Sequence, residues 1–263
     1  MRTSTSPSPK PVWYVLGVLF LLIIWEGAAR LMGSDLILPG PLPAARRLLL
    51  LLKEPRFTRA VLGSFVRVLA GIAISAPLGI LAGFIAGLNK RAGALLQPFF
   101  TLISATPVMA LILIFFLWFG QEKTPAFTVF LMVFPVMAAN TGAGLRALDP
   151  ALAELFRVYR LSAAYRLRYL YLPSLLPFIL GGLRSSLSLS WKAAVAAEVL
   201  VQPRRALGTG MQNAKAQLET PELFAWTAAA VMAAAFSQFL LSFVLALCRN
   251  HGKHGAEEAA FPV

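Results

Sequence analysis

The sequence predicts an all-α, polytopic membrane protein with about six transmembrane helices. Hydrophobic residues fill 58% of the 263 positions and charged residues only 13%, whereas a soluble domain carries about a quarter charged residues. Mean hydropathy is +0.73, and the charges cluster between apolar runs long enough to cross a bilayer. The net charge of +13 therefore indicates anionic lipid headgroups and topology signals rather than nucleic acid.

The N-terminal part predicts a tail followed by a first span. Residues 1–11 are polar and rich in Pro and Ser, which is typical of a disordered, here cytoplasmic, tail. Residues 12–32 are apolar and would extend ~31 Å as a helix, enough to cross the hydrocarbon core. A cleaved signal peptide is the alternative, because Arg2 and Lys10 precede the run and Gly27, Ala28 and Ala29 near its end are small enough for cleavage.

The first unit, residues 12–57, ends in an interfacial segment. Proline and glycine break the chain after residue 38, and a short leucine run among basic residues predicts a helix too short to span. The remainder, residues 58–248, is expected to form the transmembrane domain, and residues 249–263 a second cytoplasmic tail. Apolar runs predict its spans at residues 60–88, 96–119, 125–139, 175–201 and 223–247.

The longest polar interruption, residues 143–173, predicts two short helices. Asp149 before Pro150 is a helix start, because the carboxylate caps free N–H groups and proline at the first position loses no hydrogen bond. Ser162 is expected to cap a second helix that stops at Pro173. Apolar residues recur at helical spacing on the first helix, which predicts docking into a groove of a partner. An interfacial hairpin with snorkelling arginines is the alternative.

This loop resembles the cytoplasmic EAA signature of ABC importer permeases. Glu154 takes the acidic position, Leu155 and Phe156 stand at the two alanines, and the sequence from Leu170 to Pro173 matches the ending. Arg160 stands where the family has glycine. That departure matters most, because glycine adopts a left-handed turn freely and arginine only at a cost.

Other segments are similar to permeases of the nitrate, taurine and aliphatic sulfonate group. They are LPGP near Leu38, residues 96–120, residues 182–200 and residues 206–227, which together cover most of residues 38–248. The resemblance implies a type I ABC importer permease in a bacterial inner membrane, with cytoplasmic termini. It also implies an ABC ATPase subunit, an extracytoplasmic substrate-binding protein, a permease homodimer and a small anionic solute.

The resemblance assigns ATPase coupling to the loop. Glu154 would pair either with the partner or, as we expect, with the loop's own arginines. The coupling residues implied are Glu154, Leu155, Phe156, Arg157, Tyr159, Arg160, Leu161, Ser162, Leu172 and Pro173.

No catalytic centre is expected in this chain. The sequence has no G-x-x-x-x-G-K-[ST] phosphate loop, so ATP hydrolysis belongs to a partner and the chain is not an enzyme. The histidines, His251 and His254, and the single cysteine, Cys248, follow or end the last span. We therefore expect no metal and no cofactor.

Charged residues inside the span at 175–201 are candidates for the solute pathway, because charges inside a membrane are costly. Arg184, Glu198 and the aromatic Trp191 recur every seven residues on one stripe, and Lys192 is rotated by one position. These candidates are Arg184, Trp191, Lys192 and Glu198. Alternatively, Lys192 and Glu198 pair with residues such as Glu26 or Arg67. A stand-alone secondary transporter or channel is the other function that these charges allow.

Overall fold

The computed structural model describes residues 11–258, and the described chain is helical. The elements are α1 (Pro11–Met32), α2 (Pro41–Leu51), α3 (Pro55–Leu88), α4 (Lys90–Ala105), α5 (Val108–Arg146), α6 (Pro150–Val158), α7 (Ala163–Arg166), the π-helix η1 (Leu167–Tyr171), α8 (Leu172–Val201), α9 (Leu207–Ala216) and α10 (Thr220–Glu258). Residues 1–10 of the predicted N-terminal tail and residues 259–263 of the C-terminal one lie outside the described part. The first ten residues of the predicted tail 249–263 continue α10.

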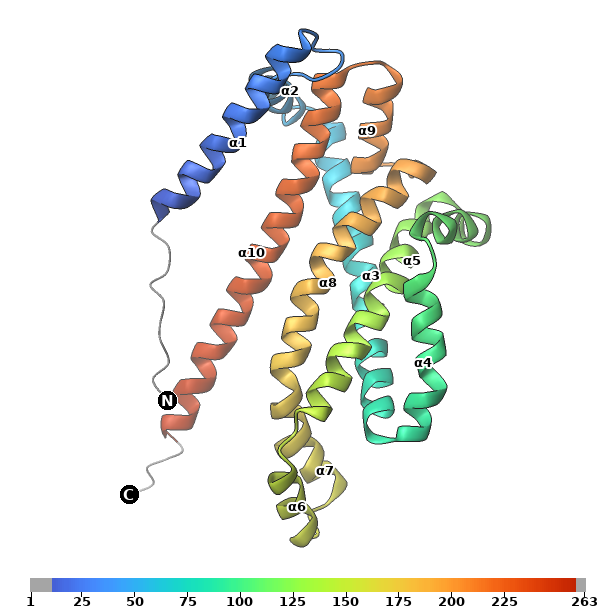
Figure 1. Cartoon of the computed structure of the whole chain (residues 1–263), viewed down its shortest axis with the longest axis vertical. Coiled ribbons are helices and arrows are strands. Elements are labelled where there is room, and N and C mark those ends of the chain that lie inside the picture. The colour runs from blue at the N-terminus through green and yellow to red at the C-terminus, as the bar shows by residue number, and fades with distance from the viewer. Residues whose placement is uncertain (1–10, 259–263) are drawn as a thin grey trace.

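Helices α3, α5 and α8 form the centre of the bundle, with α10 alongside them (Figure 1). Small residues allow the close contact between α3 and α5. A Cβ on Gly79 would stand 2.7 Å from the carbonyl oxygen of Phe134, and one on Gly83 would stand 2.3 Å from that of Ala138. Such small residues at helix interfaces let backbones approach in membranes.

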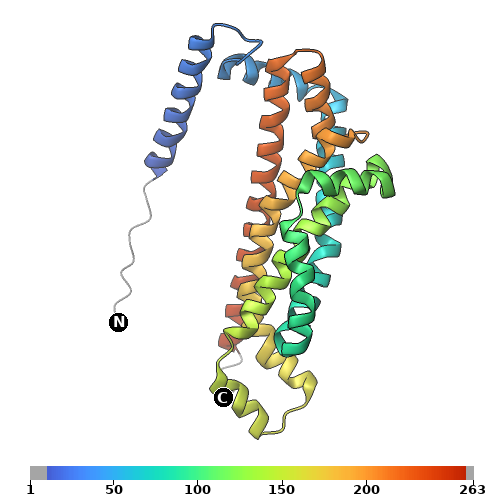
Figure 2. The same cartoon turned by 45° about the vertical axis from the view of Figure 1, so that its right-hand side comes forward.

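The bundle has two distinct ends. Helices α2 and α9 lie at one end, and α6 and α7 lie at the other, where the helix α10 also ends (Figures 1 and 2). Glu222 at the start of α10 forms ion pairs with Arg47 on α2 and with Arg56 in the first turn of α3. The starts of α3 and α10 are thus tied to α2 at the α2–α9 end.

Helix α1 stands apart from the bundle for most of its length (Figure 2). None of the residues in Val15–Met32 is buried. Near its C-terminal end, Trp25 stacks on Phe224 with 5.7 Å between ring centroids, and its Nε1 donates to the carbonyl oxygen of Pro39 over 2.9 Å. Residues Val15–Met32 of this helix are long and apolar enough to cross a membrane, as predicted for the first span.

Five helices of the described chain are long and apolar enough to cross a membrane: Val15–Met32, Pro55–Leu88, Val108–Arg146, Ala163–Val201 and Thr220–Ala246. The predicted boundaries of the spans at 96–119 and 125–139 were wrong. Thr106 is extended (ψ 130°) because it precedes Pro107, and this ends α4. Helix α4 has 16 residues, or ~24 Å, which is too short to span.

Helix α5 covers the rest of both predicted spans and bends at one point. Gly120 has φ 69° and ψ 175°, which is not helical. The segment before Gly120 lies across the bundle, whereas the segment after it runs along α3 and α8 (Figure 2). The polar turn predicted at residues 120–123 is therefore a kink inside one element.

Candidate functional site

The loop between α5 and α8 forms the two capped helices that its sequence predicts. The side chain of Asp149 accepts a hydrogen bond from the N–H of Ala151 over 2.9 Å, and Pro150 is the first residue of α6. The side chain of Ser162 accepts from the N–H of Tyr165 over 3.3 Å at the start of α7. Both caps are confirmed, and both satisfy N–H groups that a helix start leaves free.

Helix α6 presents an uncovered apolar surface at the tip of the molecule. Leu155 is 50% exposed, and Val158 and Tyr159 are each 71% exposed. None of the residues of α6 is buried within the described chain. The helix hangs beyond the ends of α5 and α8 (Figure 1), so its apolar side chains are available to another molecule.

Arg160, at the glycine position of the family signature, has a left-handed conformation with φ 49°. The N–H of Leu161 donates to the carbonyl oxygen of Phe156 over 3.3 Å, and the N–H of Arg160 donates to that of Arg157 over 3.0 Å. These two bonds make a Schellman motif, with Arg160 at the position that glycine usually fills. The turn between α6 and α7 thus keeps its form despite the substitution.

The second helix does not stop at Pro173, as predicted, but runs directly into α8. The chain is helical from Ala163 to Val201, and the π-helical segment Leu167–Tyr171 precedes the proline. The wider π-turn makes i→i+5 hydrogen bonds, and the N–H of Leu172 donates in this way to the carbonyl oxygen of Leu167, directly before Pro173. The second short helix and α8 therefore form one continuous helical element.

Glu154 is exposed and has no internal ionic partner. Among the described side chains, no basic nitrogen lies within 4.0 Å of its carboxylate. The expected pairing with the loop's own arginines is not observed. Leu161 is half-buried at the turn, and Leu172 and Pro173 are exposed at the start of α8.

The four charged or aromatic candidates on α8 separate into two pairs. Trp191 and Glu198 are buried, whereas Arg184 and Lys192 are exposed. Trp191 donates from Nε1 to Oγ of Ser237 on α10 over 3.1 Å. Arg184 borders a cavity of about 450 Å³ between α8 and α10, which Ser188 and Gln238 also line. The single stripe predicted on α8 is therefore divided between the core and the surface.

Glu198 lies in a hydrogen-bonded network at the α2–α9 end. Its Oε2 accepts from Ser64 Oγ over 2.8 Å and from the N–H of Gly208 over 3.2 Å. Its Oε1 accepts from Nη1 of Arg67 over 3.4 Å. The pairing with Arg67 is the alternative that the sequence left open, and the structure contains it. A buried carboxylate needs such partners, because burial of an unpaired charge is costly.

Arg67 extends the network to two further elements. Its Nη2 donates to Oε2 of Glu122 and to the carbonyl oxygen of Arg204, each over 2.7 Å. The other oxygen of Glu122 accepts from the N–H of Arg204 over 2.7 Å. One guanidinium thus joins α3, the bend of α5 and the turn between α8 and α9.

Sequence reasoning missed three members of this network: Ser64, Glu122 and Gly208. Glu122 had been interpreted as part of a polar turn. Opposite charges at Arg67 and Glu198, inside two separate apolar runs, were the signal for an ion pair across the bundle. The hydroxyl of Ser64 and the N–H of Gly208 carry no such signal in one sequence.

Comparison with protein families identifies the class of this molecule. Residues 75–250 match the family described as the inner membrane component of binding-protein-dependent transport systems. The chain belongs to this permease family. A permease of this family is not itself an enzyme, and ATP hydrolysis resides in a separate subunit. The permease is a multi-pass inner-membrane protein that works with an ATPase and a substrate-binding protein.

Two curated relatives resemble the permease over most of their length. The bicarbonate transport system permease protein of Synechococcus elongatus is 34% identical over 203 residues, covering 70% of each chain. The formylaminopyrimidine transport permease protein of Halalkalibacterium halodurans is 33% identical over 211 residues, covering 79% of this permease and 82% of the relative.

A solved structure supports the fold. A chain of the crystal structure of an amino acid ABC transporter with histidines superposes with a TM-score of 0.53 at 18% identity. The match covers 72% of the permease and 92% of that chain. At this identity the similarity concerns the fold alone, and it agrees with the expected ABC importer permease architecture.

Proposed function

We propose that the permease is driven by an ABC ATPase that docks on α6 and α7, and that it conducts a small anionic solute. The observation that carries the docking role is the uncovered apolar surface of α6. Leu155, Val158 and Tyr159 are exposed at the tip of the molecule, next to a turn whose backbone is fixed by two hydrogen bonds. Short helices that present apolar residues fit into grooves on partners.

Glu154 supports docking on a basic or hydrogen-bond-donating partner surface. Its carboxylate is exposed, and among the described side chains no cation lies within 4.0 Å of it. Arg157, on the same helix, is also exposed. A free carboxylate and a free guanidinium on one helix give the partner two charges to match, which favours one docked orientation.

Docking of the ATPase on α6 and α7 implies an orientation of the permease in the membrane. With α6 and α7 in the cytoplasm, the α2–α9 end faces outward, and α10 ends in the cytoplasm with them (Figure 1). The substrate-binding protein then meets the end that carries α2 and α9.

The anionic class of the solute rests on charge, not on relatedness. The two relatives are named for bicarbonate and for formylaminopyrimidine at nearly equal identity, so identity does not select a solute. Arg184 and Lys192 are exposed on α8, and cations on a pathway wall attract anions. A second copy of the chain facing these residues would complete the pathway, which favours a homodimer.

Reconstitution tests the proposal directly. Proteoliposomes that contain the permease, its ATPase and its substrate-binding protein should accumulate substrate when ATP is supplied. Omission of the ATPase, or an ATPase unable to hydrolyse ATP, should abolish uptake. Equal uptake without the ATPase would show a stand-alone transporter or channel instead.

A further inference from the structure

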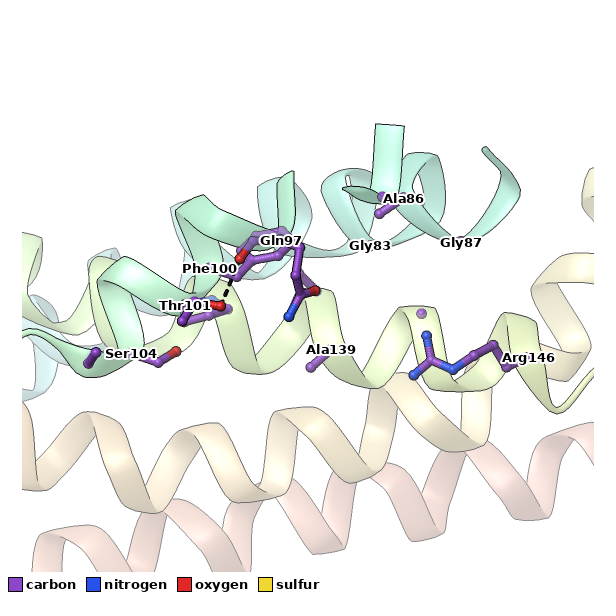
Figure 3. Close-up of a pocket in the computed structure, with 14 residues that line it drawn as sticks. Gly83, Ala86, Gly87, Gln97, Phe100, Thr101, Ser104, Ala139 and Arg146 are labelled. Atoms are coloured by element: carbon purple, nitrogen blue, oxygen red, sulfur yellow. Dashed lines mark hydrogen bonds between the residues drawn. The ribbon is translucent and has the colours of Figure 1, made fainter. Parts of the chain in front are cut away.

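A cavity of about 700 Å³ lies between α3, α4 and α5 on the side of the bundle that leads to α6 (Figure 3). Its walls are made mostly of small residues: Gly83 and Gly87 come from α3, and Ala139 and Gly142 from α5. Small side chains leave this space between helices that are otherwise closely packed. The cavity is large enough for a small solute.

One cation extends into the cavity. Arg146, the last residue of α5, folds back along its own helix in the direction of Ala139 (Figure 3). Its Nη1 lies 3.3 Å from the point where a Cβ on Gly142 would stand, so a methyl group there would move the guanidinium by a few tenths of an ångström. The absence of a side chain there lets Arg146 occupy the cavity wall.

Arg146 has no ionic partner of its own. Among the described side chains, no carboxylate oxygen lies within 4.0 Å of its guanidinium. None of the residues that line this cavity carries a carboxylate. An arginine that faces a cavity without a counter-charge has five N–H donors free for an anionic ligand.

Neutral donors lie on the facing helix. The amide of Gln97 on α4 extends into the same space as the guanidinium of Arg146 (Figure 3). Ser104 lines the cavity one to two turns further along α4, while the hydroxyl of Thr101 already donates to the carbonyl oxygen of Gln97 over 2.9 Å. A planar guanidinium opposite an amide matches the geometry of a planar oxyanion.

We infer that Arg146 and Gln97 bind a small oxyanion in this cavity, as a solute-selecting site on the cytoplasmic half of the pathway. The inference rests on the proposed function and deepens it. Arg146 precedes Asp149, the cap of α6, by three residues. Movement of α6 therefore displaces the guanidinium, and docking of the ATPase and release of the anion are linked through the same helix end.

Binding of soluble oxyanions to the purified permease–ATPase complex tests this site without any transport step. The complex, in nanodiscs of phosphatidylcholine, is titrated with nitrate, bicarbonate or methanesulfonate at constant ionic strength, and thermal unfolding is recorded. Urea serves as a neutral planar probe. We expect saturable stabilisation by at least one oxyanion and none by urea.

Variants assign the effect to the cavity. Arg146→Gln should raise the apparent Kd about tenfold or more, because hydrogen bonds to charged groups are strong, and Gln97→Leu should raise it less. Arg91→Gln is the matched control. It removes an exposed cation near the start of α4 that does not line the cavity, and it should leave the Kd unchanged.

Three results would overturn the inference. The first is equal oxyanion binding by Arg146→Gln and the wild type, and the second is no saturable effect of any of the three oxyanions. The third is Arg146-dependent stabilisation by phosphatidylglycerol nanodiscs alone, which would assign the cavity to a lipid headgroup. Failure of the importer proposal is separate, since uptake without the ATPase would leave an Arg146-dependent Kd standing.

Discussion

Nη1 of Arg67 on α3 lies 3.4 Å from Oε1 of Glu198 on α8. The Glu198 side chain is fully buried, and the Arg67 side chain is 12% exposed. The same guanidinium pairs with Glu122 over 2.7 Å. Two acids from different helices therefore share one arginine, and the arginine holds three helices of the bundle together.

Replacement of Arg67 by methionine should strongly destabilise the permease. Methionine keeps the apolar stem of the side chain without the charge, and Glu198 would keep only the donors of Ser64 and Gly208. Loss of one partner of a buried ion pair costs about 3–5 kcal/mol. Unfolding in mixed detergent micelles, followed by circular dichroism, measures the change.

Arg30→Met is the control for the loss of an arginine. Its partner Glu26 lies 2.7 Å away, but the Arg30 side chain is 80% exposed, and exposed pairs contribute about 0–1 kcal/mol. If both variants unfold at the same denaturant concentration as the wild type, Arg67 does not stabilise the bundle.

Gly79→Ala should separate α3 from α5. The new Cβ would stand 2.7 Å from the carbonyl oxygen of Phe134 and from Cβ of Met137, and a backbone atom cannot rotate away. Overpacking of this kind costs about 1–3 kcal/mol. Thermal unfolding of the purified protein reports the loss.

Gly27→Ala provides the matched comparison on α1. A Cβ there meets nothing within 4 Å, and alanine favours a helix over glycine by up to about 1 kcal/mol. Gly27→Ala should therefore be neutral or stabilising. A lower melting temperature for Gly27→Ala than for Gly79→Ala would refute the close contact of α3 with α5.

Arg160→Gly should preserve coupling, and Arg160→Val should impair it. The φ of 49° suits glycine, while a left-handed conformation costs other residues about 1–2 kcal/mol and more for a β-branched one. ATP hydrolysis stimulated by the substrate-binding protein gives the readout. Equal loss in both variants would show that the charge of Arg160, and not the turn, is required.

Glu154→Arg combined with Phe156→Asp should prevent the ATPase from binding. The double variant reverses one charge on α6 and places another on its half-buried apolar residue, so like charges and desolvation oppose docking. Co-purification of the ATPase from membranes should fall to background while the permease remains inserted.

Glu219→Arg with Leu218→Asp repeats the same chemistry at the opposite end. Both residues are exposed in the turn between α9 and α10, and the ATPase should co-purify with this variant as with the wild type. Retention of the ATPase by the α6 variant would show that docking occurs elsewhere.

Local signals were readable from the sequence, and tertiary ones were not. The caps at Asp149 and Ser162 depend on a side chain and an N–H two or three residues away, so residue type and order suffice to predict them. The pair Thr106–Pro107 is also a local signal, because the residue before a proline disfavours a helix. Apolar residues on both sides of it led to one predicted span at 96–119, where the structure has the end of α4 and the start of α5.

The surroundings of Glu198 and Trp191 depend on residues far away in the chain. Ser64 and Ser237 reach them only after α3, α8 and α10 have packed, and nothing in the sequence near α8 indicates these partners. The end of the second short helix shows the same limit. The sequence predicts that this helix stops at Pro173, but the π-turn Leu167–Tyr171 lets the chain continue as a helix past the proline.

The guanidinium of Arg67 binds Glu122 on α5, and the opposite end of α5 carries Arg146 and leads to α6. From Glu122 to Arg146 the helix is ~36 Å long at 1.5 Å per residue. A tilt of α5 by about 5° around its contact with Arg67 would displace Arg146 by roughly 3 Å and Glu122 hardly at all. Tilting of α5 about this contact would therefore move the end of the bundle that carries α6 and α7 and leave the α2–α9 end almost in place.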